Sequence, residues 1–260
     1  MKPTIQILLY TEREKQNSKY PVKIRVIYQR QHRDFKIGLD MTKDEFAEAS
    51  KPKPSKAFIK AAIDNGAKYI VVGVGSNVAP IGSAQILEVK NPRQFLAEAA
   101  SVFYKKQPEN IVCVTGTNGK TSTVNFVRQI WEKLGARAAS LGTLGVLGHG
   151  IEDYSGMTTP DPVWLHARLS ELANKNIQNL AMEASSIGIE QHRLDGVKVS
   201  AAAFTNITRD HLDYHGTMDE YFAAKLRLFT TLLREDGVAV VNADTGYFDK
   251  IKSECQKRNI

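Results

Sequence analysis

A Gly-rich turn bearing a lysine and a threonine follows a short apolar stretch, Ile111–Val114, near the middle of the chain. Glycines let backbone N–H groups approach phosphate oxygens, and a lysine adds a full positive charge. The apolar residues that follow have helical spacing, so the turn opens a helix whose N-terminus adds partial positive charge. The turn residues are Gly116, Thr117, Asn118, Gly119, Lys120, Thr121 and Ser122. Their types and order predict a triphosphate-binding loop, with the Thr121 hydroxyl placed to bind Mg²⁺.

This turn does not meet the strict nucleotide-loop pattern. That pattern requires a glycine five residues before the second glycine of the loop, and Val114 occupies that position. Gly116 supplies the first glycine of a shorter loop instead. The alternative interpretation of this segment, taken alone, is an ordinary tight turn. Other parts of the chain must distinguish that turn from a phosphate-binding loop.

Two further groups of polar residues follow predicted buried strands. Glu183 lies near the end of a strand over residues 180–184, and His211 follows a strand over 199–205. Because parallel strands bring their carboxyl ends to one edge of a sheet, both side chains are expected near the turn. Glu183 with His211 or Asp210 then completes a Mg²⁺ site. The alternatives are a solvated polar loop behind Glu183 and a structural hydrogen bond for the histidine, since Mg²⁺ prefers oxygen ligands.

Two other positions have both an ordinary and a functional interpretation. Lys225 lies among apolar residues of a predicted helix, and this spacing alone predicts a lysine whose stem covers apolar surface while its amine reaches solvent. Thr158 and Thr159 precede Pro160-Asp161 at a helix start. They either bind an anionic group or belong to the cap of that helix.

The elements that must position these residues alternate between strand and helix from residue 57 onward. The predicted segments are a helix over 58–65, a strand over 69–73, a helix over 95–104, a strand over 111–114, a helix over 162–174, strands over 180–184 and 199–205, a helix over 218–233 and a strand over 237–242. Asp161 caps the helix that begins at Pro162. Thr217 and Glu220 form a capping box for the last helix. The alternation predicts an α/β fold with a parallel sheet.

The first fifty residues form a separate, basic, β-rich unit. Strands are predicted over residues 4–10, 22–29 and 33–39, followed by a helix over 42–49 and a Pro-containing linker over 51–56. Residues 1–60 hold 14 Lys and Arg against 7 Asp and Glu, whereas residues 61–260 hold 21 of each. The net charge of +7 therefore lies in the N-terminal part, and any nucleic-acid binding depends on it.

Cysteine usage and hydropathy favour the cytoplasm. Cys113 and Cys255 form no metal-binding pattern, which is typical of a reducing compartment. The N-terminal apolar run over residues 5–10 is too short for a signal peptide, and no later segment approaches membrane-spanning length. We expect a cytoplasmic protein without membrane contact.

Four motifs in this order resemble those of the Mur ligases: TGTNGKTS, TTPDP, EASSIGIEQHRLDG and TNITRDHLDYHG. The resemblance implies a remnant of that family's N-terminal domain over 57–107 and its central ATP-binding domain, with a parallel sheet, over 108–260. It implies an ATP-dependent ligase of peptidoglycan synthesis, and so of cell-wall biogenesis, cell shape and cell division. Such a ligase adds the third amino acid, meso-diaminopimelate or L-lysine, to UDP-N-acetylmuramoyl-L-alanyl-D-glutamate. Folylpolyglutamate synthases, which share the loop and the fold, are an alternative.

The resemblance also implies roles for single residues. ATP phosphorylates a substrate carboxylate, and the incoming amine displaces phosphate from the resulting acyl phosphate. Lys120 contacts the phosphates of ATP, Thr121, Glu183 and His211 bind Mg²⁺, and Lys120, Lys225 and His211 are catalytic. Lys225 matches the lysine that the family carbamylates, which turns a cation into a carboxylate-like group able to support a second metal. The muramoyl dipeptide is placed against residues matching Thr158, Thr159, Ser185, Gln191 and Arg193.

The two ends of the chain depart from that pattern. The family's uridine-binding segment, with its Asp-Ser-Arg motif, has no counterpart, because the resemblance begins at Phe58. The chain stops at Ile260, inside the central domain, so we expect an incomplete copy without the domain that receives the amino acid. Residues 1–50 resemble instead the arm-type DNA-binding domain of phage-integrase-like recombinases, whose sheet lies on phosphates. The alternative function is therefore a DNA-binding module fused to a non-functional ATPase fragment.

Overall fold

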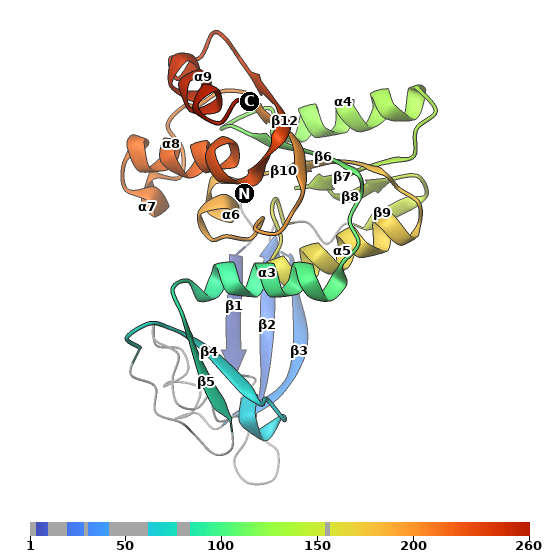
Figure 1. Cartoon of the computed structure of the whole chain (residues 1–260). Helices are drawn as coiled ribbons and strands as arrows, with labels where there is room; N and C mark the ends of the chain where they lie inside the picture. The colour runs from blue at the N-terminus through green and yellow to red at the C-terminus, as the bar shows by residue number, and fades with distance from the viewer. Residues whose placement is uncertain (1–3, 10–19, 29–30, 42–61, 77–83, 154–156) are drawn as a thin grey trace. The chain divides into compact units, whose positions relative to one another are not determined.

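The computed structural model describes residues 4–9, 20–28, 31–41, 62–76, 84–153 and 157–260, and the first three of these ranges as backbone only (Figure 1). Its contacts divide the chain into two units, Met1–Lys90 and Asn91–Ile260, referred to as unit 1 and unit 2.

Unit 1 contains two small sheets. Strands β1 (Thr4–Leu9), β2 (Tyr20–Tyr28) and β3 (Gln31–Met41) form an antiparallel sheet in that order, which confirms the three predicted strands. Strands β4 (Tyr69–Gly73) and β5 (Gln85–Val89) pair in parallel. The predicted helix over 42–49, the linker over 51–56 and the first part of the helix over 58–65 lie outside the described residues.

Unit 2 is built on a seven-stranded sheet of order β12-β11-β6-β10-β7-β8-β9. The strands are β6 (Asn110–Thr115), β7 (Ala138–Gly142), β8 (Gly145–Gly148), β9 (Ile151–Asp153), β10 (Asn179–Glu183), β11 (Val199–Phe204) and β12 (Leu233–Val241). The first five in the sheet order run parallel, which confirms the α/β prediction. Strands β8 and β9 extend the sheet in antiparallel fashion and were not predicted, because four and three residues are too few to show an alternating pattern.

The helices of unit 2 follow most of the predicted boundaries. They are α3 (Pro92–Tyr104), α4 (Lys120–Lys133), α5 (Pro162–Asn174), α6 (Ser186–Glu190), α7 (Leu212–His215), α8 (Met218–Arg227), the π-helical turn η1 (Leu228–Leu232) and α9 (Phe248–Lys257). The Asp161 side chain accepts from the Trp164 N–H at 3.0 Å, and Thr217 with Glu220 forms the predicted capping box. No helix among the described residues is both long and apolar enough to cross a membrane.

Helices α4 and α5 lie on opposite faces of the sheet of unit 2 (Figure 1), and an apolar core is buried on each face. Alternate residues of β10 divide between them: Leu180 and Met182 join the larger core, and Ala181 packs in the smaller one with Val124 of α4. All three β10 residues are fully buried. The packing fixes the carboxyl ends of β6, β10 and β11 at one edge, where the chemistry-bearing residues follow.

Candidate active site

Most of the predicted functional residues line one pocket of about 250 Å³ in unit 2, and Gly116, Ser122, Thr159, Gln191 and Arg193 lie outside its lining. It lies at the carboxyl ends of β6 and β10, where open parallel sheets bind ligands. Its lining residues are Thr117, Asn118, Gly119, Lys120, Thr121, Thr143, Thr158, Glu183, Ser185, Ser186, His211, Tyr221 and Lys225. Five segments and helix α8 therefore converge on this pocket: the segments that follow β6, β7, β10 and β11, and the one that precedes α5.

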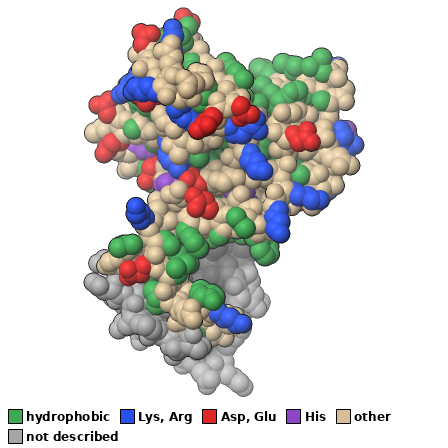
Figure 2. Space-filling view, viewed as in Figure 1, with side chains coloured by type: hydrophobic (Ala, Val, Ile, Leu, Met, Phe, Trp, Pro, Cys, Tyr) green, Lys and Arg blue, Asp and Glu red, His purple; other side chains and the backbone are tan. Residues whose placement is uncertain are grey.

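A larger hollow of about 470 Å³ lies on the outer face of α4. Its lining consists of Phe126, Gln129, Ile130, Lys133 and Leu134, so it offers a single ionisable group. Figure 2 shows the hydrophobic surface over this helix at the upper right. Of these two hollows, the smaller pocket holds the carboxylate, the imidazole and the two amines that suit acid–base or metal chemistry.

The loop between β6 and α4 has the backbone conformation of an anion-binding turn. Gly116 and Gly119 adopt φ angles of 145° and 85°, which favour glycine. A Cβ atom on Gly116 would lie 2.0 Å from the Thr205 Oγ1 atom, so this position has no room for a side chain. The segment after β11 holds the loop from the other side: the Asn118 N–H donates to Asn206 Oδ1 at 2.9 Å.

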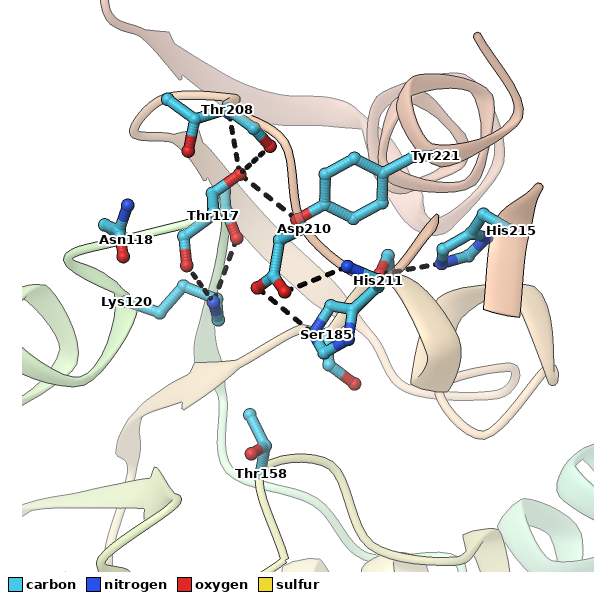
Figure 3. Close-up of polar contacts among 12 residues, drawn as sticks. Thr117, Asn118, Lys120, Thr158, Ser185, Thr208, Asp210, His211, His215 and Tyr221 are labelled. Atoms are coloured by element: carbon cyan, nitrogen blue, oxygen red, sulfur yellow. Dashed lines mark hydrogen bonds and ion pairs between the residues drawn. The ribbon is translucent and has the colours of Figure 1, made fainter. Parts of the chain in front are cut away.

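Lys120 begins α4 and folds back over this loop (Figure 3). Its Nζ donates to the carbonyls of Gly116 and Thr117 at 2.9 and 2.8 Å. Burial lowers the pKa of Lys120, while the nearby carboxylates of Glu183 and Asp210 raise it. The ammonium group therefore lies at the rim of the loop, beside the first N–H groups of the helix. A bound phosphate would meet both kinds of positive charge there.

Glu183 ends β10 and is only 1% exposed. Its Oε1 atom accepts from the Thr121 hydroxyl at 3.0 Å and from the Thr143 N–H at 2.8 Å. A Cβ on Gly142 would lie 2.1 Å from the same oxygen, so the glycine makes room for the carboxylate. Thr121 and Glu183 thus present two oxygens to the pocket, which is the donor type that Mg²⁺ takes together with phosphate and water oxygens.

His211 lines the same pocket from the segment after β11. It has a left-handed backbone, with φ of 53°, and its Nε2 lies 3.5 Å from Asp210 Oδ2 (Figure 3). Within the described residues, no three His, Cys, Asp or Glu side chains gather as a metal site. The role of His211 as a Mg²⁺ ligand beside Glu183 stays a prediction.

Lys225 lies on α8 and is 1% exposed. The interpretation from spacing alone, an amine that reaches solvent, is therefore wrong, because the fold turns this helix face onto the phosphate loop. Its Nζ donates to the Gly116 carbonyl at 2.9 Å, the oxygen that Lys120 also contacts. Burial, and then the positive charge of Lys120, lowers the pKa of Lys225 to about 7. More of the amine is therefore neutral near pH 7 than in an ordinary lysine.

The five predicted substrate residues divide into two groups. Thr158 and Ser185 line the pocket. Thr159 is 2% exposed, and its hydroxyl donates to the Glu183 carbonyl and accepts from the Ser185 N–H, both at 3.0 Å. The Ser185 hydroxyl also accepts from the Gly188 N–H, which caps α6.

Gln191 and Arg193 lie outside the pocket lining. Arg193 donates to the Thr159 carbonyl and to Gln191 Oε1, both at 2.7 Å. The Gln191 amide donates in turn to the Tyr214 hydroxyl at 2.8 Å. These two side chains hold the segments around the pocket together in this conformation. Ser122, within the first turn of α4, is likewise absent from the pocket lining.

Three lining residues were not predicted: Thr143, Ser186 and Tyr221. Thr143 lies in the turn between β7 and β8, where no sequence pattern indicates a functional residue. Tyr221 precedes Lys225 by four residues and so shares its helix face, a signal that the sequence contained. Ser186 follows Ser185 directly, and its hydroxyl lies 3.0 Å from His215 Nε2.

Sequence comparison agrees with this geometry. Residues 114–260 match the family model of the Mur ligase middle domain. A UDP-N-acetylmuramoyl-L-alanyl-D-glutamate–2,6-diaminopimelate ligase of Agrobacterium fabrum is 53% identical over 194 residues, which are 75% of this chain and 39% of that protein. The ligase of the same name from Rhizobium meliloti is 49% identical over 198 residues, 76% of this chain and 40% of that protein. The chain thus spans about two fifths of the length of these curated relatives.

Solved structures show the same fold. A structure of a 2,6-diaminopimelate ligase of this kind superposes with a TM-score of 0.69 at 30% identity, covering 80% of this chain and 42% of that one. Escherichia coli FolC in complex with ADP reaches 0.50 at 18% identity, covering 70% and 47%, which is a likeness of fold alone. The predicted DNA contact of residues 1–50 is not tested by these matches and stays a prediction.

Proposed function

Since this chain belongs to the Mur ligase family, we propose that it serves as an ATP-dependent ligase of peptidoglycan precursor synthesis. The reaction joins an amino acid to UDP-N-acetylmuramoyl-L-alanyl-D-glutamate. The names of the relatives that are about half identical favour 2,6-diaminopimelate as that amino acid. The cytoplasm, where the nucleotide-linked precursor is made, is the proposed location.

One observation carries this proposal: the phosphate loop, the Glu183 carboxylate and the Lys225 amine share a single pocket. A loop that binds phosphate by itself indicates only a nucleotide site. A buried carboxylate and a buried amine beside it add the groups that a metal-assisted phosphoryl transfer needs. We also propose 108–260 as the ATP-binding domain and 57–107 as part of the domain before it.

The reaction brings negatively charged groups together. The glutamate carboxylate of the precursor attacks the γ-phosphorus of ATP; an oxygen–phosphorus bond forms and the bond to ADP breaks. The amine of the amino acid then attacks the acyl carbon, loses a proton and displaces inorganic phosphate, which leaves an amide. Lys120 and the N-terminus of α4 offset the charge that develops on the transferred group.

A divalent cation would be held by Thr121 and Glu183, whose oxygens face the pocket 3.0 Å apart. When bound, Mg²⁺ would neutralise charge on the phosphates. His211 is the proposed third ligand. Thr121 and Thr143 fix the Glu183 carboxylate from two sides, so this chain orients the ligand before the metal arrives.

Lys225 is the proposed site of carbamylation. The neutral amine attacks CO₂, a nitrogen–carbon bond forms while one carbon–oxygen π bond opens, and one proton leaves the nitrogen, so the neutral amine becomes an anionic carbamate. A pKa of about 7 supports this, because an ordinary lysine holds little neutral amine at that pH. The anionic product would then face the ammonium group of Lys120 across the Gly116 carbonyl.

The precursor is proposed to bind at the side of the pocket formed by Thr158 and Ser185. Thr159, Gln191 and Arg193 complete the proposed substrate residues. In the described conformation Arg193 supports the Thr158–Thr159 segment through the Thr159 carbonyl, so its contribution includes shaping this side of the pocket.

The test combines binding and turnover. The protein is titrated with Mg²⁺ and ATP, and phosphate release is then followed with the UDP-muramoyl dipeptide and diaminopimelate, with L-lysine in a parallel reaction. Lys120→Ala should weaken nucleotide binding by about 30-fold, because a charged hydrogen-bond donor is lost. Lys133→Ala, in the last turn of the same helix, is the matched control and should bind as the wild type does. Equal binding by both variants would refute the proposed site.

A further inference from the structure

Tyr221 lies on α8 one turn before Lys225 and contacts two parts of the pocket at once. The residue is 1% exposed. Its hydroxyl lies 3.1 Å from Thr117 Oγ1 in the phosphate loop. The Nζ of Lys225 lies over its ring, 4.4 Å from the ring centre. One side chain therefore bridges the loop and the buried amine.

The direction of the hydroxyl contact follows from the partners of Thr117. The Thr208 N–H donates to Thr117 Oγ1 at 2.9 Å, and the Thr117 hydroxyl donates to the Thr208 carbonyl at 3.2 Å. A hydroxyl has one proton, so with this proton on the Thr208 carbonyl the Tyr221 hydroxyl is the donor to Thr117. Figure 3 shows these three residues joined in this way. The contact orients the loop beside Lys120.

The ring contact has a different consequence. An ammonium group over an aromatic face is attracted by the ring quadrupole. Lys225 is thereby held between the Tyr221 ring and the Gly116 carbonyl, 2.9 Å from that oxygen. Tyr221 contacts Thr117 and Lys225 contacts Gly116, which are neighbours in the loop. Together the two side chains therefore attach α8 to one short stretch of the loop.

We propose that Tyr221 is a positioning residue, whose hydroxyl fixes the phosphate loop through Thr117 while its ring fixes the amine of Lys225. The inference rests on the proposed nucleotide site and deepens it: the loop and α8 are set in one arrangement before a triphosphate binds. The competing explanation is a tyrosine that only fills the core. In that case, changes in nucleotide affinity follow changes in stability and show no specific coupling to Thr117 or Lys225.

The first test is a double-mutant cycle with Thr117→Val and Tyr221→Phe, read as the Kd for a non-hydrolysable ATP analogue with Mg²⁺ by calorimetry. Tyr221→Phe keeps the ring and removes one hydrogen bond, so it should weaken binding about threefold to tenfold. The Kd of the double variant should not exceed that of the more weakly binding single variant, because both substitutions remove the same contact between the Tyr221 hydroxyl and Thr117. Tyr247→Phe, whose ring stacks on Phe222 instead, is the matched control and should combine additively with Thr117→Val.

The second cycle uses Tyr221→Leu, which also removes the ring, and Lys225→Met, with thermal unfolding as a check on folding. Lys225→Met should weaken binding severalfold in the wild type and much less in the Tyr221→Leu background. Additive effects in both cycles would overturn the inference while leaving the nucleotide site intact. A wild-type protein that does not bind the analogue would overturn the proposed function and the inference together.

Discussion

The phosphate loop and the Gln191–Arg193 segment both follow strands at the same edge of the sheet, yet they use their donors differently. Lys120 points its ammonium group at two carbonyls of its own loop, which a bound phosphate can replace as partners. The guanidinium of Arg193 donates instead to the Thr159 carbonyl and to the Gln191 side chain, which are parts of the fold around the pocket. The hydrogen bonds of Lys120 are therefore replaceable by bonds to a ligand, whereas those of Arg193 hold the fold together.

This difference separates two roles that a cationic side chain in a motif can have. A cation whose partners are neighbouring loop carbonyls loses little when a stronger anionic partner arrives. A half-buried guanidinium that joins two segments leaves acceptors without partners when it is removed. Substitutions in the loop should therefore change ligand binding, and substitutions at Arg193 should first change stability.

The largest effect is expected at Gly116. Gly116→Ala would place a Cβ 2.0 Å from Thr205 Oγ1 and near the backbone of Asn206, at a φ of 145°. Backbone strain and this clash should weaken nucleotide binding by roughly 3 kcal/mol, or about 150-fold. Gly119→Ala is the comparison, because its φ of 85° imposes strain but no atom lies within 4 Å of the new Cβ. Titration with an ATP analogue should show a clearly smaller loss for Gly119→Ala, and equal losses would contradict the clash.

The loop side should also show a pH dependence that arises from Lys225. The pKa of Lys225 is about 7 in the folded protein and close to 10.5 when unfolded, so the unfolded state binds more protons between these values. The free energy of unfolding should therefore rise with pH above 7, by about 2 kcal/mol between pH 7 and 9 for this one group. Lys225→Met removes the group, so denaturant unfolding of this variant should show a correspondingly weaker rise. Parallel curves for the two proteins would disprove the depressed pKa.

The next effect tests the other region. Arg193→Ala should lower the free energy of unfolding by about 1.5 kcal/mol, because the Thr159 carbonyl and Gln191 lose their partner. Binding of an ATP analogue should change less than twofold. Arg137→Ala is a suitable control, since that exposed arginine's guanidinium donates to the Lys175 carbonyl, away from the pocket lining. A loss of nucleotide affinity without a loss of stability would contradict this prediction, because Arg193 would then act in ligand binding as the loop residues do.

Local patterns predicted the loop side well. The strand, turn and helix from 110 to 133 follow from an apolar run, two glycines and helical spacing, all of which are properties of neighbouring residues. The burial of Lys225 depends on how α8 packs against a loop 109 residues earlier, and no local pattern contains that. Thr143 is similar, because its N–H meets Glu183 only after β7 and β10 pair. The antiparallel strands β8 and β9 were missed for a different reason, since strands of four and three residues carry no periodic signal.

Glu183 belongs to both regions and gives the smallest and sharpest prediction. Its carboxylate accepts from Thr121 on the loop side, and its backbone carbonyl accepts from Thr159 on the other side. Glu183→Gln keeps the backbone contact and the side-chain shape but removes the charge. Nucleotide affinity should fall about tenfold with Mg²⁺ present and change little when EDTA removes the metal, because a neutral amide is a poorer Mg²⁺ ligand. The unfolding free energy should stay closer to that of the wild type than in Arg193→Ala. An equal loss of affinity with and without Mg²⁺ would mean that the carboxylate shapes the loop instead of holding a metal.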